Sequence, residues 1–510
     1  MLAINIPAEG IFLAIQSRNL EKYTPEACRE ITRAYISRFL SSKPEIIFLN
    51  VCYRRSLVDS QVFDTFLHTV TTDEKGNTVK RENPDTENNN KYFRAIFDCA
   101  RELLREQIDV FKTAVEVIRA AGCKVYFSVR MNDGHFTDDP SINSSRSFDL
   151  GGRYTVVKDG FIFFDYSQKP IQNYVGSYIR ELATNYDLDG IELDWLRHPI
   201  VLPESKYSDL EILNTYMADI RNMLREIRPN MGLAVRVLAN EKAGLGLGMD
   251  GAAWIARGYA DILTISNFHT PTNFEMPVNQ WRTSIQSKNT DNRPYTLLCG
   301  CDWGASCVYG RTIPLTPAMV RAFCNDCYQK RTDGIYLFNF MEEDAPSSWE
   351  LTEDAQGRPQ LKKCFMERIM AVYHPQDLPR RYPYVGYTNR RYPIPVPKKE
   401  AYAFSMHANK PFGKCKLVIA YDTDADFTVS VNGCENIPMK RQIVHPGYEY
   451  EENFVFQGDP IVHAVSQVAP FVAAADLPPA ALAAEDFQIR LNNESNRDTK
   501  LLWAELNFDA

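Results

Sequence analysis

Short apolar runs alternate with amphipathic segments from the N-terminal region to about residue 372, and no other feature constrains the fold as strongly. Runs of this length, bounded by polar turns, are typical of strands buried on both faces. Because parallel strands are joined by crossover helices, eight such units predict an α/β fold, the closed (β/α)8 barrel. The expected strands are Ile11–Ile15, Ile46–Cys52, Lys124–Arg130, Gly190–Asp194, Leu233–Leu238, Asp261–Ser266, Tyr295–Cys301 and Gly334–Asn339.

The segments between the runs carry helix signals. Ser208 and Glu211 are spaced as a capping box ahead of an apolar stripe at helical spacing. Pro170 stands where a first-turn proline is tolerated. Two long segments, residues 54–92 and 131–168, follow strands and precede helices. We therefore expect both to wall a cleft at the C-terminal end of the barrel.

The character of the chain changes after the last expected barrel helix. Residues 374–400 are rich in Pro, Tyr and Arg, which predicts an extended linker. Residues 401–510 contain short alternating runs separated by turn residues, which predicts a β-sandwich, with a loop or short helix at the Ala/Pro-rich stretch 469–484. The expected domains are thus a barrel over 1–373, the linker, and an accessory sandwich over 401–510.

Composition excludes several classes of protein. The net charge of −8 leaves no general basic footprint for nucleic acid, and no apolar run is long enough to span a membrane. The first residues lack the basic and apolar regions of a signal peptide, so we expect a cytoplasmic protein, or a periplasmic or secreted one if a leader has been removed. Cys324 and Cys327 form a CxxC without a second ligand pair, so neither a metal nor another cofactor is expected. The sequence does not indicate an oligomeric state.

Two carboxylates interrupt the fourth expected strand. Side chains two residues apart share one face of a strand, so Glu192 and Asp194 point the same way. Arg197-His198-Pro199 ends the run, which places Asp194 at the C-terminal tip, where active sites of barrel enzymes lie. A buried carboxylate pair is costly without a partner or a purpose, and a structural ion pair is the alternative to a catalytic role.

Arginines lie in the neighbouring strands. Arg130 and Arg236 fall inside expected strands three and five, and a buried guanidinium keeps its proton and needs an anion. Glu192 and Asp194 are the nearest candidates, and at least one of them is then ionised. Alternatively, the arginines bind a uronate or sulfate group of an acidic sugar.

The segment from Tyr166 to Pro199, with Asp187-Leu188-Asp189-Gly190-Ile191-Glu192-Leu193-Asp194 at its centre, resembles bacterial proteins called family 10 like glycosyl hydrolases. Residues 234–237, 246–250 with Trp254, and 333–340 are similar to later strands of that family. The resemblance covers about residues 9–372 and implies a (β/α)8 barrel that acts on a glycan. Leu196 stands where chitinase-like barrels carry their catalytic acid, so substrate-assisted chitinase chemistry is not expected.

Glycoside hydrolysis normally needs one ionised and one protonated carboxyl group. Asp194 supplies the first in our prediction, and the candidates for the second are Asp302, Glu241 and Glu342 or Glu343. Asp302 directly follows an apolar run, and by analogy with other barrel glycosidases strands four and seven carry the pair. We assign Asp194 as nucleophile or base, Glu192 as its orienting partner and Asp302 as proton donor, with the reverse order of the two aspartates left open.

Further polar or aromatic residues follow the expected strands, where hydroxyl-rich ligands are bound. The expected substrate-binding residues are Arg130, Asn132, His135, Arg197, His198, Arg236, Asn267, His269, Trp303, Asn339 and Glu342, with Gln16, Arg18 and Asn50 as further strand-tip residues. The first expected strand has no HxH motif, so a metal-dependent amidohydrolase is disfavoured.

The predicted function is therefore hydrolysis of a glycosidic bond in a poly- or oligosaccharide. The arginines are compatible with an acidic saccharide. A lyase or transglycosylase and a glycan-binding protein without activity are the alternatives. The sandwich shows no cluster of carboxylates at strand tips and is expected to be non-catalytic. It either supports the barrel, which we favour, or helps hold the glycan.

Overall fold

The computed structural model describes residues 1–7, 9–18, 20–73, 75, 77–83, 91–134, 154–267, 272–302, 304–306, 312–315, 317–338, 349–353, 359–363, 384–387, 393–408, 413–442 and 471–508. The chain divides into two compact units. The first comprises residues 1–268 and 277–300, and the second comprises residues 269–276 and 301–510.

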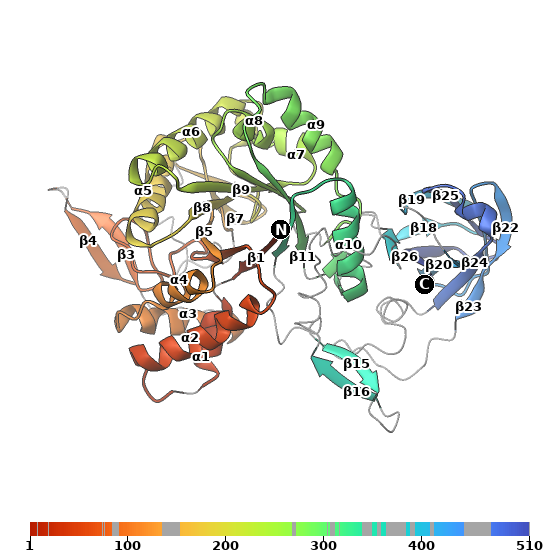
Figure 1. Cartoon of the computed structure of the whole chain (residues 1–510), viewed down its shortest axis with the longest axis horizontal. Helices are drawn as coiled ribbons and strands as arrows, with labels where there is room; N and C mark the ends of the chain where they lie inside the picture. Colours follow the sequence, from red (N-terminus) through yellow and green to blue (C-terminus); the bar gives the residue numbers. More distant parts are fainter. Residues whose placement is uncertain are drawn as a thin grey trace. The chain divides into compact units, whose positions relative to one another are not determined.

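Eight parallel strands close a barrel, as the alternation of apolar runs predicts (Figure 1). Around the barrel their order is β1 (Leu2–Ile6), β14 (Gly334–Phe338), β11 (Thr296–Asp302), β10 (Ile262–Ser266), β9 (Gly232–Leu238), β8 (Gly190–Asp194), β5 (Lys124–Arg130) and β2 (Ile46–Asn50). The helices are α1 (Glu9–Gln16), α2 (Pro25–Leu40), α3 (Lys91–Arg105), α4 (Val110–Ala120), α5 (Lys169–Asn185), α6 (Leu210–Ile227), α7 (Glu241–Leu245), α8 (Gly251–Ala256), α9 (Val278–Lys288) and α10 (Pro317–Gln329). The fold class is confirmed.

The first barrel strand is not the one predicted. Residues 11–15 belong to helix α1, whose buried side chains Ile11, Phe12 and Ile15 lie on one helical face. The strand is β1, and every residue in it is buried. A five-residue apolar run has too few residues to separate a buried helix from a strand by periodicity. Gln16 therefore ends a helix rather than following a strand.

Both long segments that were expected to wall a cleft contain a β-hairpin. Strands β3 (His68–Thr72) and β4 (Thr78–Glu82) pair in the first, and β6 (Thr155–Lys158) and β7 (Phe161–Phe164) pair in the second. Among the described residues, β12 (Gly304–Ser306) also pairs with β13 (Thr312–Pro314), and β15 (Trp349–Glu353) pairs with β16 (Pro359–Lys363), each in antiparallel orientation.

One large ring sets the packing of neighbouring strands in the barrel. Tyr126 on β5 lies in register with Gly190 on β8, which in turn faces Gly232 on β9. A Cβ atom at Gly190 would lie 2.2 Å from the Tyr126 ring, and one at Gly232 would lie 2.2 Å from the Tyr126 hydroxyl. The two glycines thus leave the space that the ring fills.

We expect Gly232→Ala to destabilise the protein by about 1–3 kcal/mol through overpacking. Tyr126→Phe removes the clashing hydroxyl and should restore part of the loss. The same Phe should not rescue Gly190→Ala, because a Cβ there would also lie 2.5 Å from the Gly232 carbonyl oxygen. Chemical denaturation of the single and double variants measures this, and equal rescue of both alanines would contradict the packing described.

Antiparallel sheets follow the barrel. One has the order β17 (Tyr384–Tyr387), β26 (Thr499–Phe508), β20 (Cys415–Tyr421), β24 (Phe471–Leu477) and β23 (Lys440–Gln442), with β18 (Ile394–Val396) also on β26. The other has the order β19 (Ala401–His407), β25 (Asp486–Asn493), β21 (Phe427–Val431) and β22 (Cys434–Pro438). Their side chains alternate between buried and more exposed positions in β19, β21 and β25, as a sandwich requires.

Two short stretches differ from the sequence-based description. Strands β17 and β18 lie within the expected linker, yet both pair with β26. The alanine-rich stretch predicted as loop or short helix forms strand β24, which pairs with β20, and only a 3-10 turn at Pro479–Leu482 is helical. Burial between neighbouring strands overrides the helix propensity of alanine there. Of the helices that the structure describes, none has the length and apolar character needed to cross a membrane.

Candidate active site

Charged side chains form a row at the C-terminal end of three neighbouring strands. Arg130 on β5, Asp194 on β8 and Arg236 on β9 are register partners, so they point to the same side of the sheet. Glu192 lies one layer below, between Ser128 and Ala234 in register. The predicted common face of Glu192 and Asp194 agrees with this register, and both carboxylates are buried.

Asp194 is held by Arg236 through a bidentate ion pair. Arg236 donates from Nε to Oδ1 and from Nη2 to Oδ2, each at 2.9 Å, and the Leu196 N–H donates to Oδ1 at 3.0 Å. Only 1% of the Asp194 side chain and 2% of the Arg236 side chain are exposed. Two parallel charge-assisted bonds bind a carboxylate in its ionised form and fix its orientation.

Arg130 does not use the partner expected from sequence. Its Nη1 donates to Oδ2 of Asp133 at 2.9 Å, and its Nη2 lies 3.7 Å from Oε1 of Glu9. Its guanidinium also lies 4.6 Å from the centre of the Tyr53 ring. Burial alone would lower the pKa of Arg130, but Glu9 and Asp133 outweigh that effect and raise it. Only Arg236 pairs with a carboxylate of β8 in the way that the sequence predicted.

The loop after β8 is pinned to the loop after β5. His198 Nδ1 accepts the N–H of Gly134 at 3.0 Å and lies 3.7 Å from Oδ1 of Asp133. The backbone of His198 has φ 152°, which side chains rarely adopt. A Cβ atom at position 134 would lie 2.5 Å from the Phe163 ring, so the glycine leaves room for that ring. Backbone strain of this kind persists where surrounding contacts enforce it, and it clusters at functional sites.

The side-chain amide of Asn132 is hydrogen-bonded to other parts of the protein, unlike that of a residue that faces a ligand. Its Oδ1 accepts from Arg54 Nη1 at 3.0 Å and from the Phe164 N–H at 2.9 Å, and its Nδ2 donates to the Phe164 carbonyl at 2.9 Å and the Ile200 carbonyl at 2.5 Å. These contacts use its hydrogen-bonding capacity inside the protein. Asn132 thereby anchors the β6–β7 hairpin beside the row of charges.

The remaining predicted residues are distributed over both units. Asp302, half-buried at the end of β11, belongs to the second unit, where Thr272 Oγ1 donates to its carbonyl at 2.9 Å and accepts its N–H at 3.0 Å. Asn267 follows β10 and is half-buried. His135, His269, Trp303, Asn339 and Glu342 lie outside the described residues.

Three residues near the row were not among the sequence-based candidates. Glu9 is the first residue of α1, three positions after the end of β1, and would have been found had that strand been recognised. Arg54 follows β2, and its guanidinium lies 3.4 Å from the centre of the Phe164 ring, while burial lowers its pKa to about 10. Phe161 on β7 is 38% exposed, with its ring 6.4 Å from that of His198. Nothing in the sequence separates Phe161 from the buried phenylalanines beside it.

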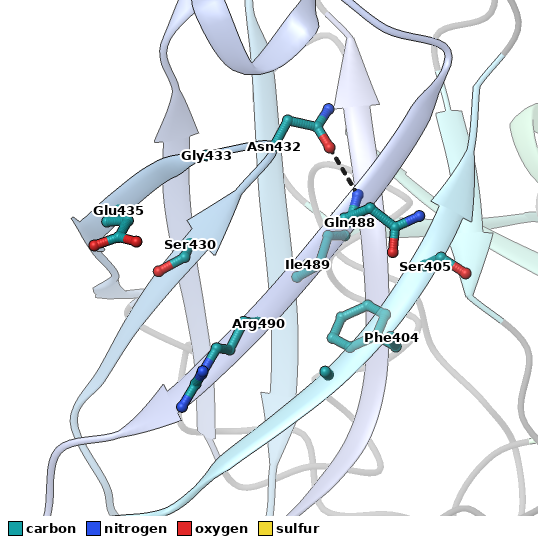
Figure 2. A pocket seen from close by; sticks show the side chains of 10 residues that line it. Phe404, Ser405, Ser430, Asn432, Gly433, Glu435, Gln488, Ile489 and Arg490 are labelled. Atoms are coloured by element: carbon teal, nitrogen blue, oxygen red, sulfur yellow. Dashed lines mark hydrogen bonds between the residues drawn. The ribbon is translucent and has the colours of Figure 1, made fainter.

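A groove of about 390 Å³ lies on the four-stranded sheet of the second unit (Figure 2). Ser405, Gln488, Arg490, Ser430 and Glu435 line it with hydroxyl, amide and charged groups. Ala403 and Ser430 are register partners of Arg490 on either side, so small side chains flank a long one. This arrangement hollows the sheet face along β25.

The part of the chain that the structure describes contains no group of three His, Cys, Asp or Glu side chains placed to share a metal ion. Cys324 and Cys327 on α10 are both buried, as is Cys52 beside the row of charges. Burial raises the pKa of Cys52 to about 12, because the thiolate loses its hydration. This cysteine is therefore not an activated nucleophile.

Solved structures similar to this chain include several carbohydrate-active enzymes. An endo-β-1,4-mannanase from Thermotoga petrophila is 9% identical with a TM-score of 0.43, covering 99% of this chain and 97% of that chain. A cycloisomaltooligosaccharide glucanotransferase from Paenibacillus (10% identity, TM-score 0.34, 99% of this chain) and an α-L-fucosidase from Paenibacillus thiaminolyticus (11%, 0.40, 67%) are longer proteins. This chain spans 57% and 45% of their respective lengths.

These likenesses are distant. No protein-family model and no curated protein matches the chain. The specific family resemblance noted in the sequence therefore stays a prediction. The chain has distant structural similarity to barrel-fold glycoside hydrolases, without assignment to any one family.

Proposed function

We propose that the barrel hydrolyses glycosidic bonds, with Asp194 as the ionised carboxylate. The observation that carries this proposal is the bidentate contact of Arg236, which holds Asp194 at the C-terminal end of β8. Of about four acceptor positions on a carboxylate, the three observed hydrogen bonds use two on Oδ1 and one on Oδ2. Oδ2 therefore keeps a lone pair that can accept a proton from water or attack the anomeric carbon.

Asp302 is the proton donor in this proposal. A glycosidic oxygen needs a proton as the bond to the anomeric carbon breaks, and the ionised Asp194 then either activates water or attacks that carbon. Asp302 lies half-buried at the C-terminal end of β11, and Thr272 fixes its backbone through both the N–H and the carbonyl group. Glu192, buried one layer below Asp194, orients the row.

The decisive experiment incubates the protein with a panel of neutral and acidic polysaccharides. Release of reducing ends supports hydrolysis, whereas an ultraviolet chromophore from an unsaturated uronate indicates a lyase. Products longer than the substrate indicate a transglycosylase. Binding without any product would leave a glycan-binding protein and contradict the proposed hydrolysis.

We further propose that the groove of the second unit holds glycan. Support of the barrel is the role favoured by sequence, and the polar lining of the groove is an observation in favour of ligand binding. Hydroxyl, amide and charged groups from the four neighbouring strands β19, β25, β21 and β22 match the hydroxyls of a sugar chain.

Arg490→Ala is expected to weaken retention of the protein on polysaccharide, because it removes the longest hydrogen-bonding side chain of the groove. Turnover of a short oligosaccharide should not change. Lys416→Ala, an exposed residue of the other sheet, is the matched control. Affinity electrophoresis compares the variants, and equal retention of both would favour a supporting role instead.

A further inference from the structure

We infer that the groove on the four-stranded sheet of the second unit binds an uncharged glycan chain that crosses the β-strands. This inference rests on the proposed binding of glycan in that groove, and it names the class of the glycan. It starts from two exposed side chains of opposite charge that line the groove, Arg490 on β25 and Glu435 on β22.

The two charges are separated within the groove. Ser430 on β21 is the register partner of Arg490, and it lies between Arg490 and Glu435 (Figure 2). In the described part of the chain neither charge forms an ion pair, with the other or with any further residue. By contrast, His407 and Asp486, register partners on the same sheet, approach each other to 2.8 Å. Both charged groups of the groove therefore face solvent, where a ligand can reach them.

An uncharged sugar chain satisfies both groups, whereas a charged one satisfies only one of them. A guanidinium only donates hydrogen bonds and a carboxylate only accepts them, but a sugar hydroxyl does both. Hydroxyls of one chain can thus form charge-assisted hydrogen bonds with Arg490 and with Glu435. An anionic substituent would be repelled by Glu435, and a cationic one by Arg490. Opposite charges two strand spacings apart, roughly 10 Å, therefore favour an uncharged ligand.

The polar groups of the groove are ordered across the strands. Ala403 and Ser430 flank Arg490 in register, and Ser405 is the register partner of Gln488. The lining extends from β19 through β25 and β21 to β22, which is three strand spacings or about 14 Å. A ligand that contacts both edges must cross the strands. We therefore expect the affinity to rise with chain length until the ligand spans the groove.

The floor of the groove is rigid and presents little apolar surface. Phe404 and Ile489 belong to its lining but are only 8% and 2% exposed. Asn432 Oδ1 accepts the N–H of Gln488 at 2.8 Å, and its Nδ2 donates to the Ala481 carbonyl at 2.9 Å. Recognition then depends on hydrogen bonds to hydroxyls rather than on stacking against a ring. A floor fixed before binding also reduces the entropy lost on binding.

The test compares one polymer backbone in uncharged and charged form. Hydroxyethylcellulose and glucomannan are the uncharged probes, and carboxymethylcellulose is the anionic counterpart of the first. Calorimetry of the full chain measures their binding. We expect Arg490→Gln and Glu435→Gln each to weaken binding of an uncharged probe by about 10-fold, the loss of one hydrogen bond to a charged group.

Two control variants make the same changes of charge elsewhere. Lys416 and Asp476 are exposed register partners on the other sheet. Lys416→Gln and Asp476→Asn should leave the affinity unchanged. Binding of the uncharged probe should also vary little with salt concentration, because it involves no attraction between ions of opposite charge.

The sign of the effect at Glu435 decides the outcome. Weaker binding of the uncharged probe in both groove variants upholds the inference. Tighter binding in Glu435→Gln with carboxymethylcellulose as the preferred probe would overturn it, although the groove would still hold glycan. Failure of both uncharged probes to bind, or equal losses in the controls, would overturn it too. Groove-dependent binding without cleavage of any polysaccharide would uphold the inference while the proposed hydrolysis fails, and hydrolysis without groove binding would do the reverse.

Discussion

Asp194→Asn is expected to abolish hydrolysis and to destabilise the fold together. The amide keeps the shape of the side chain but cannot act as a base or nucleophile, so kcat should fall by about 10³-fold or more. It also leaves the buried Arg236 without its compensating charge, which costs about 3–5 kcal/mol. Initial rates and urea denaturation measure the two effects separately.

A double variant separates catalysis from stability. Asp194→Leu with Arg236→Met replaces the ion pair by apolar side chains, and such replacements of buried pairs often restore or raise stability. We expect the melting temperature to recover while activity stays absent. Glu211→Gln, which breaks an exposed pair with Arg257, should cost less than about 1 kcal/mol and leave kcat unchanged. An active double variant would remove Asp194 from the mechanism.

Asp302→Asn should lower kcat by about 10²–10⁴-fold, the range for loss of a general acid. The loss of melting temperature should be smaller than for Asp194→Asn, because Asp194 is fully buried in a bidentate ion pair whereas residue 302 is half-buried and keeps its backbone contacts with Thr272.

The nature of the leaving group tests this assignment further. A substrate with an activated aryl leaving group needs little proton donation, so the Asn variant should regain most of its rate on such a substrate. The alkaline limb of the pH profile of kcat/KM should also disappear. Equal rate losses on activated and natural substrates would instead assign Asp302 to substrate binding. The same assay on Asp194 variants would then test whether Asp194 is the proton donor.

Local pattern was sufficient for much of the barrel. A strand buried on both faces is mostly apolar, and seven of the eight barrel strands were recognisable in the sequence as such runs. The shared face of Glu192 and Asp194 also followed from the chain alone, because side chains two residues apart in a strand point the same way. The apolar run at residues 11–15 was too short to distinguish a buried strand from a buried helix, and these residues form part of helix α1 instead of the expected strand.

Only the tertiary structure decided which charges pair. Arg130, Asp194 and Arg236 lie far apart in the sequence, and the register of their strands makes them neighbours. The sequence predicted that each arginine pairs with a carboxylate of β8. Arg130 instead pairs with Asp133, which lies in a loop, and lies near Glu9 at the start of α1. Ion pairs form between groups that packing brings together, and the local periodicity of the sequence does not predict which groups these are. The sequence by itself determined that the barrel forms and that its end is charged, whereas packing between distant segments decided how those charges are paired.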